Sequence, residues 1–314
     1  MKLSELVAFR NTLNKMSSVE VQHHADVSLN KITHLVETQP TQFANFTKDL
    51  ANCQAEIHQS YQKFEQQLTQ LKTEVSQLIA VAEKPWFQES YRLYEEEMVH
   101  ETVDYILDRR PMLTSDAEMT LKSRLMNYTD WRYPGMIIRP GRENFIQDMV
   151  SYDPLYLIDQ DRELLTPAIS QFPEQYQQRL RPYVINEYGG EPILTKIPDG
   201  QFGICLVYNF FNFRPFEVIR QYLTEIYDKL KPGGTLIMTI NDCDSEKAVD
   251  LVERHFACYT PGYLIKNLAK SIGYQQVFTW NDGGPTTWVE LRRPGQITSL
   301  KGGQTLAKRV AKSK

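Results

Sequence analysis

The sequence predicts an α/β domain built on a parallel sheet, preceded by an all-α, partly coiled-coil region. Three observations carry this prediction. All 15 glycines lie between Gly135 and Gly303, and glycine-free sequence suits long helices, whereas turn-rich α/β domains need glycine. A seam of apolar residues with heptad-like steps runs from Phe46 to Leu78. Residues 196–240 have the pattern of a strand, a helix, a tight turn and a second strand.

Residues 1–84 are predicted to be a helical region. Residues 1–39 form one or two helices that end before Pro40, and a longer helix runs from about Phe46 to Lys84. Its apolar residues recur in steps of three and four: Phe46, Leu50, Cys53, Ile57, Tyr61, Phe64, Leu68, Leu71, Val75 and Leu78. Two interpretations are open. The helix is either an oligomerising coiled coil, which makes the chain a homo-oligomer, or a member of a helical bundle within its own chain.

Residues 85–133 are predicted to be a helical connector, with one helix over Trp86–Arg109 and another that starts at Ser115. The first helix carries four groups that can ligate metals, namely Glu97, His100, Glu101 and Asp104. A di-iron site needs a second Glu-x-x-His motif from another helix, and the sequence has none. We therefore predict a solvated acidic face and no metal site. The aromatic segment Asn127–Gly135 is either a packed connector or a lid over a site.

Residues 134–296 are predicted to form the α/β domain. Phe202–Tyr208 is a short apolar run typical of a buried strand, and Phe216–Leu230 has apolar residues at helical spacing. The turn Lys231-Pro232-Gly233-Gly234 ends that helix, because proline cannot continue it and glycine allows the chain to reverse. Thr235–Ile240 is a second buried strand. A unit of this length makes a right-handed crossover between parallel strands.

Further strands and helices are expected on both sides of this unit. The predicted strands are Gly135–Ile138, Leu155–Ile158, Tyr183–Asn186 and Thr286–Leu291. A sixth strand follows Ile272 and forms a hairpin with the last one through Asp282-Gly283-Gly284. The predicted helices are Asn144–Ser151, Leu164–Phe172, Glu246–Phe256 and Tyr263–Ile272.

The run from Ile197 to Thr239, with IPDGQF before the strand and KLKPGG after the helix, resembles the middle of class I S-adenosylmethionine-dependent methyltransferases. In that family an LPxxxFD lead-in precedes the strand and LKPGG follows the helix. The resemblance covers about residues 134–294. It implies a doubly wound, Rossmann-like methyltransferase domain and S-adenosyl-L-methionine as the cofactor.

The resemblance also implies where the cofactor binds. After its first strand the family has an acidic residue followed by alternating glycines, roughly E/D-x-G-x-G-x-G, which let the backbone approach the methionine moiety. Here Gly141 is the one glycine in that run. Ile137 replaces the acid, and Arg139 and Glu143 occupy glycine positions.

At the end of the second strand the family has an acid that accepts hydrogen bonds from the ribose hydroxyls. Asp159 matches it, and Asp161 is the second choice. The alternative for Asp159 is an N-cap of the following helix. After the fourth strand, Asn209 stands where amino-methyltransferases have the first residue of a D/N-P-P-Y/F motif, although both prolines are absent. Asn209 is therefore a candidate for both acceptor and cofactor contacts.

Composition limits the other functions. The net charge of −4 gives no general attraction for nucleic acid or an anionic membrane, and no apolar run is long enough to span one. The four cysteines form no CxxC pair. We expect a soluble, cytoplasmic protein. Residues 297–314 form a basic tail, which is either a flexible terminus or a contact for nucleic acid or an acidic protein partner.

Two functional hypotheses follow. The first is a S-adenosylmethionine-dependent methyltransferase with an N-terminal region for oligomerisation or partner docking. The second is a catalytically inactive protein of the same fold, which serves as a structural or scaffolding subunit through its coiled coil. The substitutions at Ile137, Arg139 and Glu143 favour the second hypothesis.

Overall fold

The computed structural model describes most of the chain. The described residues are 2–16, 26–27, 30–34, 38, 46–99, 115–128, 132–140, 145–160, 162–187, 192–281 and 283–295. Several predicted features lie outside them: the candidate cofactor residues Gly141 and Asp161, the substituted Glu143, and the basic tail. The acidic face predicted around His100 and Glu101 also lies outside the described residues.

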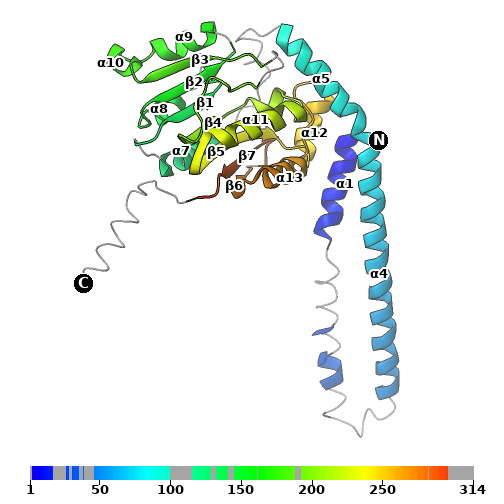
Figure 1. Cartoon of the computed structure of the whole chain (residues 1–314). Coiled ribbons are helices and arrows are strands. Elements are labelled where there is room, and N and C mark those ends of the chain that lie inside the picture. The colour runs from blue at the N-terminus through cyan, green and yellow to red at the C-terminus, as the bar shows by residue number, and fades with distance from the viewer. Residues whose placement is uncertain are drawn as a thin grey trace, which may run out of the picture. The chain divides into compact units, whose positions relative to one another are not determined.

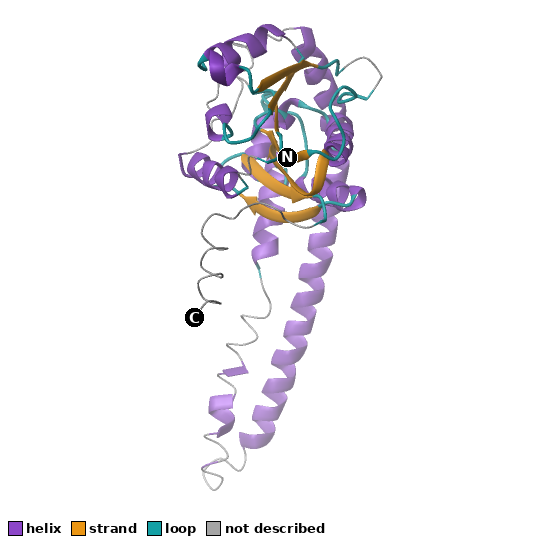
Figure 2. Cartoon of the chain, turned by 60° about the vertical axis from the view of Figure 1, so that its left-hand side comes forward, coloured by secondary structure: helices purple, strands orange, loops and turns teal. Residues whose placement is uncertain are grey.

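The chain divides into two compact units, Met1–Lys84 and Pro85–Lys314. The first contains α1 (Leu3–Lys15) and the long helix α4 (Phe46–Ala82), which stands out in Figure 2. Helix α1 packs against α4. Val75 and Ile79 are buried on α4, while Leu78, a member of the predicted seam, is 52% exposed. Part of α4 thus packs within its own chain.

The described part of the second unit contains N-terminal helices and an α/β fold (Figure 1). Its strands are β1 (Gly135–Ile138), β2 (Leu155–Asp159), β3 (Leu180–Val184), β4 (Phe202–Val207), β5 (Leu230–Asn241), β6 (Gln275–Trp280) and β7 (Thr286–Arg292). Its helices are α5 (Lys84–Val99), α7 (Ser115–Asn127), α8 (Phe145–Asp148), α9 (Arg162–Ser170), α10 (Glu174–Gln177), α11 (Phe216–Lys229), α12 (Glu246–Glu253) and α13 (Gly262–Ile272), with a 3-10 turn η1 (Phe211–Phe213).

The seven strands form one sheet in the order β3-β2-β1-β4-β5-β7-β6. Strands β1 to β5 pair in parallel, whereas β7 is antiparallel to both β5 and β6. The chain adds strands in one direction as far as β3 and then returns to β4 beside β1. The predicted doubly wound, Rossmann-like fold and the predicted hairpin of β6 with β7 are confirmed.

Alternate residues of the central strands point to opposite faces, and each face has its own core. Met136 and Ile138 pack with α11 and α13, while Ile137 between them packs with α7, α8 and α9. Figure 1 shows these two sets of helices on the two sides of the sheet. The near-continuous apolar pattern of the strands follows from this burial on both faces.

The predicted crossover is present as β4, α11 and β5. Helix α11 buries Ile219, Tyr222, Leu223 and Ile226 in the core. The residues predicted as a turn, 231–234, belong to β5, which begins at Leu230 and not at Thr235. The pairing of β4 with β5 shifts register here, between Phe202 and Ile204. Gly233 has a φ of 80°, and a Cβ on Gly234 would lie 2.6 Å from the carbonyl oxygen of Phe202, so both positions favour glycine.

Some predicted boundaries are wrong. The third strand is Leu180–Val184, not Tyr183–Asn186. Its bounds follow its pairing with β2, which runs from Leu155 opposite Leu180 to Asp159 opposite Val184. The helix predicted over Asn144–Ser151 is only the four residues of α8. The long helix ends at Ala82, and α5 begins at Lys84 with Pro85 in its first turn, where proline is tolerated.

Candidate functional site

The carboxyl ends of the parallel strands meet at one edge of the sheet, and the strand order reverses between β1 and β4. Ligands of doubly wound folds bind at such a switch point. Three polar residues lie at this edge: Arg139 after β1, Asp159 at the end of β2, and Asn209 after β4. They are only 6%, 3% and 2% exposed, respectively. The structure thus brings Asp159 and Asn209 to the same edge, with β1 between their strands.

Two of these residues have left-handed backbones. Arg139 has a φ of 54° and Asn209 a φ of 47°. The Arg139 N–H donates to the carbonyl oxygen of Ile158 at 2.7 Å, and the Asn209 N–H donates to Oγ1 of Thr239 at 2.7 Å. A non-glycine residue in this conformation costs about 1–2 kcal/mol. Such strain is concentrated at functional sites, and glycine would adopt this conformation at the position of Arg139 without it.

Asp159 is held next to its own strand end. Its Oδ1 accepts a hydrogen bond from the backbone N–H of Gln160 at 2.7 Å. Helix α9 begins at Arg162, three residues after Asp159. Whether Asp159 caps this helix or contacts a ligand stays a prediction.

A buried ion pair that the sequence did not predict lies at the same edge. Glu187, three residues after β3, pairs with Arg214, with 2.7 Å between Oε1 and Nε, and their side chains are 0% and 1% exposed. Tyr94 of α5 donates to Oε1 at 2.6 Å, and Tyr222 of α11 donates to Oε2 at 3.0 Å. The Gln160 side chain also donates to Oε2. These donors satisfy the acceptor positions of the Glu187 carboxylate.

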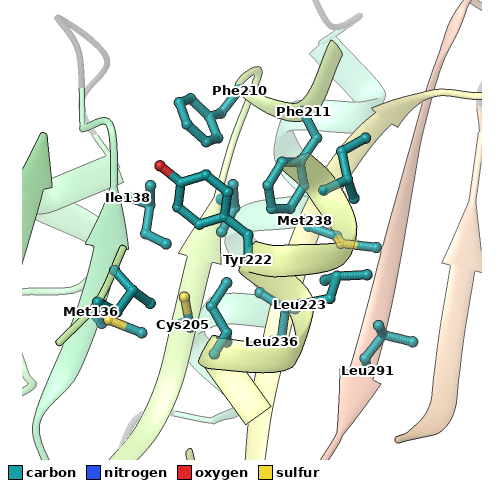
Figure 3. Close-up of a cluster of buried hydrophobic side chains, with 14 of the residues drawn as sticks. Met136, Ile138, Cys205, Phe210, Phe211, Tyr222, Leu223, Leu236, Met238 and Leu291 are labelled. Atoms are coloured by element: carbon teal, nitrogen blue, oxygen red, sulfur yellow. The ribbon is translucent and has the colours of Figure 1, made fainter. Parts of the chain in front are cut away.

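Aromatic rings surround the Arg214 guanidinium. Its central carbon lies 4.3 Å from the ring centroid of Phe210 and 5.3 Å from that of Tyr94. Phe210 in turn meets Tyr222 edge to face at 5.2 Å, and Figure 3 shows the Tyr222 hydroxyl on the side of Phe210 and Ile138. Burial raises the pKa of the Tyr222 hydroxyl well above its usual value, and the charge of Glu187 adds to this shift. Tyr222 therefore stays a neutral donor.

A second asparagine follows β4 within η1. Asn212 is fully buried, and within the described part of the chain neither polar atom of its side-chain amide has a hydrogen-bond partner. Its backbone oxygen accepts from the N–H of Cys258 at 2.8 Å. Buried amides are normally hydrogen-bonded, so the Asn212 side chain is a candidate for a ligand contact. The repeated asparagines of the segment YNFFNF were the signal that the sequence offered.

Two negative findings apply to the described residues alone. Within them, no group of three or more histidine, cysteine, aspartate or glutamate side chains is arranged to hold a metal ion. None of the helices in the described part of the chain is long and apolar enough to cross a membrane.

Neither a protein-family model nor a curated protein matches the sequence. Solved structures match in fold. A geranyl diphosphate C-methyltransferase from Streptomyces coelicolor, solved with S-adenosyl-L-homocysteine, is 8% identical, with 57% of this chain and 80% of that chain covered and a TM-score of 0.46. A S-adenosylmethionine-dependent methyltransferase from Mesorhizobium loti is 10% identical, with 56% and 97% covered and a TM-score of 0.45.

An O-methyltransferase family protein from Burkholderia thailandensis is 10% identical, with 57% of this chain and 56% of that chain covered and a TM-score of 0.45. All three of these proteins are methyltransferases by name, and this chain is similar to each of them over part of its length. The similarity covers little more than half of the chain.

Proposed function

We propose that this protein is a S-adenosylmethionine-dependent methyltransferase whose cofactor lies across the carboxyl ends of β1, β2 and β4. The observation that carries the proposal is the Asp159 carboxylate, buried at the switch point of a doubly wound sheet. A carboxylate in this place suits the two ribose hydroxyls. The guanidinium of Arg139 lies 5.7 Å from the ring centroid of Phe210. It therefore reaches from β1 toward the segment after β4, where it supplies a cation for the carboxylate of the cofactor.

The bound cofactor supplies an activated methyl group on a sulfonium. The protein's task is to align an acceptor with that methyl group and to exclude water. Asn209, directly after β4, is the residue that we assign to the acceptor side. Its backbone is left-handed, with a φ of 47°. The hydrogen-bonding groups of Asn209 and its neighbours select the chemical class of the methyl acceptor.

Calorimetric titration of the full chain with S-adenosyl-L-homocysteine tests the proposal. We expect binding by the wild type and a loss of at least tenfold in affinity for Asp159→Asn, because hydrogen bonds to a charged acceptor are worth about 1.5–3 kcal/mol. The matched control is Asp228→Asn, an exposed aspartate near the end of α11. No heat at millimolar ligand refutes cofactor binding, and equal losses in both variants refute the role of Asp159.

One observation favours a second candidate, a non-catalytic scaffolding subunit. The Glu187 carboxylate is already satisfied by Tyr94, Tyr222, Gln160 and Arg214, and this pair fills part of the edge where a cofactor would bind. This candidate predicts no binding of S-adenosyl-L-homocysteine and an assembly role for the N-terminal helices.

We also propose that the chain forms a homo-oligomer through Phe46–Lys84, under either candidate. On α4, Phe64, Leu71 and Leu78 follow one another at seven-residue steps and are 40%, 37% and 52% exposed. Heptad spacing of apolar residues is the pattern of a coiled-coil seam. Replacing all three with glutamine should turn the oligomer into a monomer in light scattering. The control replaces Met119 and Met126, 63% and 69% exposed on α7. A monomeric wild type at micromolar concentration refutes this proposal.

A further inference from the structure

Helix α5 is tied to two loops at the carboxyl edge of the sheet. Near its start, Phe87 packs edge to face against Tyr259 with 5.1 Å between ring centroids. One turn later, Oγ of Ser90 accepts a hydrogen bond from the Tyr259 N–H at 2.7 Å, and the Cys258 thiol donates to the Ser90 carbonyl at 3.4 Å. These contacts fix α5 to the loop that follows α12.

The other end of the described part of α5 reaches the buried ion pair. The hydroxyl of Tyr94 donates to Glu187 at 2.6 Å, and its ring lies over the Arg214 guanidinium. Tyr94 is 93 residues from Glu187 in the sequence. One helix therefore joins the loop after β3, the segment after β4 and the loop after α12.

Polar groups are buried in the segments that α5 joins. Glu187 and Arg214 are bonded to Tyr94 or packed against it. Asn212, whose amide has no hydrogen-bond partner, is bonded through its carbonyl to Cys258, which contacts Ser90. A charged pair and an unsatisfied amide cost free energy to bury. Their presence at a ligand-binding edge indicates that they face a ligand when the edge is open.

We propose that α5 is an autoinhibitory cap over the carboxyl edge, held closed by the hydrogen bond of Tyr94 to Glu187, and that its release admits ligand to Glu187, Arg214 and Asn212. This inference rests on the proposed function and adds a control element to the same site. In the closed form, the Tyr94 hydroxyl occupies an acceptor position that a donor on the ligand takes in the open form. Ligand and cap therefore compete, and weakening the cap strengthens ligand binding.

The test compares full-length wild type with three variants, using S-adenosyl-L-homocysteine as the probe in calorimetry and hydrogen exchange of the α5 amides as a second measurement. Tyr94→Phe keeps the ring and removes the hydroxyl. Ser90→Ala weakens the same helix at its other attachment. Tyr91→Phe is the matched control, because Tyr91 lies on α5 and is 40% exposed.

We expect Tyr94→Phe to bind about tenfold more tightly than wild type, with about fivefold faster exchange in α5. Ser90→Ala should act in the same direction, and Tyr91→Phe should match wild type. A wild type that binds, with Tyr94→Phe equal or weaker, overturns the cap and leaves the proposed function standing. Binding by Tyr94→Phe but not by wild type supports both. No binding by any form overturns both.

Discussion

Replacing Glu187 with glutamine should strongly destabilise the second unit. Glutamine keeps the size of the side chain, but it keeps only one of the two oxygens that accept from Tyr94 and Tyr222, and it removes the charge opposite Arg214. That guanidinium is 1% exposed, and its partner carboxylate is 0% exposed. Removing one member of a buried ion pair leaves an uncompensated charge and costs about 3–5 kcal/mol. This is a large part of the 5–15 kcal/mol that typically stabilises a domain.

Urea unfolding followed by tryptophan fluorescence measures this loss in the right unit, since all four tryptophans follow Pro85. The matched control is Glu217→Gln. Its ion pair with Arg220 has nearly the same length, 2.6 Å, but the side chains are 52% and 57% exposed. Exposed pairs contribute about 0–1 kcal/mol. The two ion pairs, Glu187 with Arg214 and Glu217 with Arg220, thus have nearly the same length but differ in burial.

The double variant Glu187→Gln with Arg214→Met sharpens the test. A methionine of similar length removes the stranded charge, and buried ion pairs are often replaced by apolar residues at little cost. We expect the double variant to recover most of the stability lost by Glu187→Gln alone. Equal costs for Glu187→Gln and Glu217→Gln would refute the reasoning, as would a double variant that is less stable than the single one.

Three further predictions concern other parts of the second unit. Gly234→Ala should cost about 1–3 kcal/mol in urea unfolding, because its Cβ would lie 2.6 Å from the Phe202 carbonyl oxygen. Glu290→Gln should cost about 2 kcal/mol by the same measurement, because this 1% exposed carboxylate accepts from Arg124 at 2.8 Å. Burial, and then the charge of Asp244, raise the pKa of Asp242. The folded state therefore holds its proton more tightly, and wild type should lose stability relative to Asp242→Asn as the pH rises from about 4 through the raised pKa.

Each of these predictions has a control. A Cβ on Gly200 would meet no atom within 4 Å, so Gly200→Ala should lower the free energy of unfolding only by the strain of its φ of 68°. An equal loss of stability for Gly234→Ala contradicts the steric argument. Glu217→Gln serves again beside Glu290→Gln, and similar losses argue against the buried contact. For the pH series, the exposed Asp250→Asn should stay parallel to wild type. A difference between wild type and Asp242→Asn that does not change with pH is inconsistent with the raised pKa.

The crossover from Phe202 to Ile240 could be predicted because each of its elements is encoded by residues close together in the sequence. Buried strands, an amphipathic helix and a Pro-Gly-Gly turn each leave a pattern within a few residues, and a right-handed crossover follows from chain geometry. The same logic placed Asp159 at the end of β2. Where the local pattern was weak the boundaries were wrong. Strand β3 has exposed residues at Arg181 and Pro182, so its start depended on pairing with β2.

The sequence by itself determined the doubly wound fold, the helical N-terminal region and the strand ends that carry Asp159 and Asn209. Only the tertiary structure decided that Glu187 pairs with Arg214 and is covered by Tyr94. These residues lie 27 and 93 positions from Glu187 in the chain. No periodicity links them, because their pairing depends on how the segments after β3 and β4 meet α5. Glu187, Arg214 and Tyr94 are ordinary polar residues in the sequence. They gain their roles at the candidate site because the fold buries them together where these segments meet.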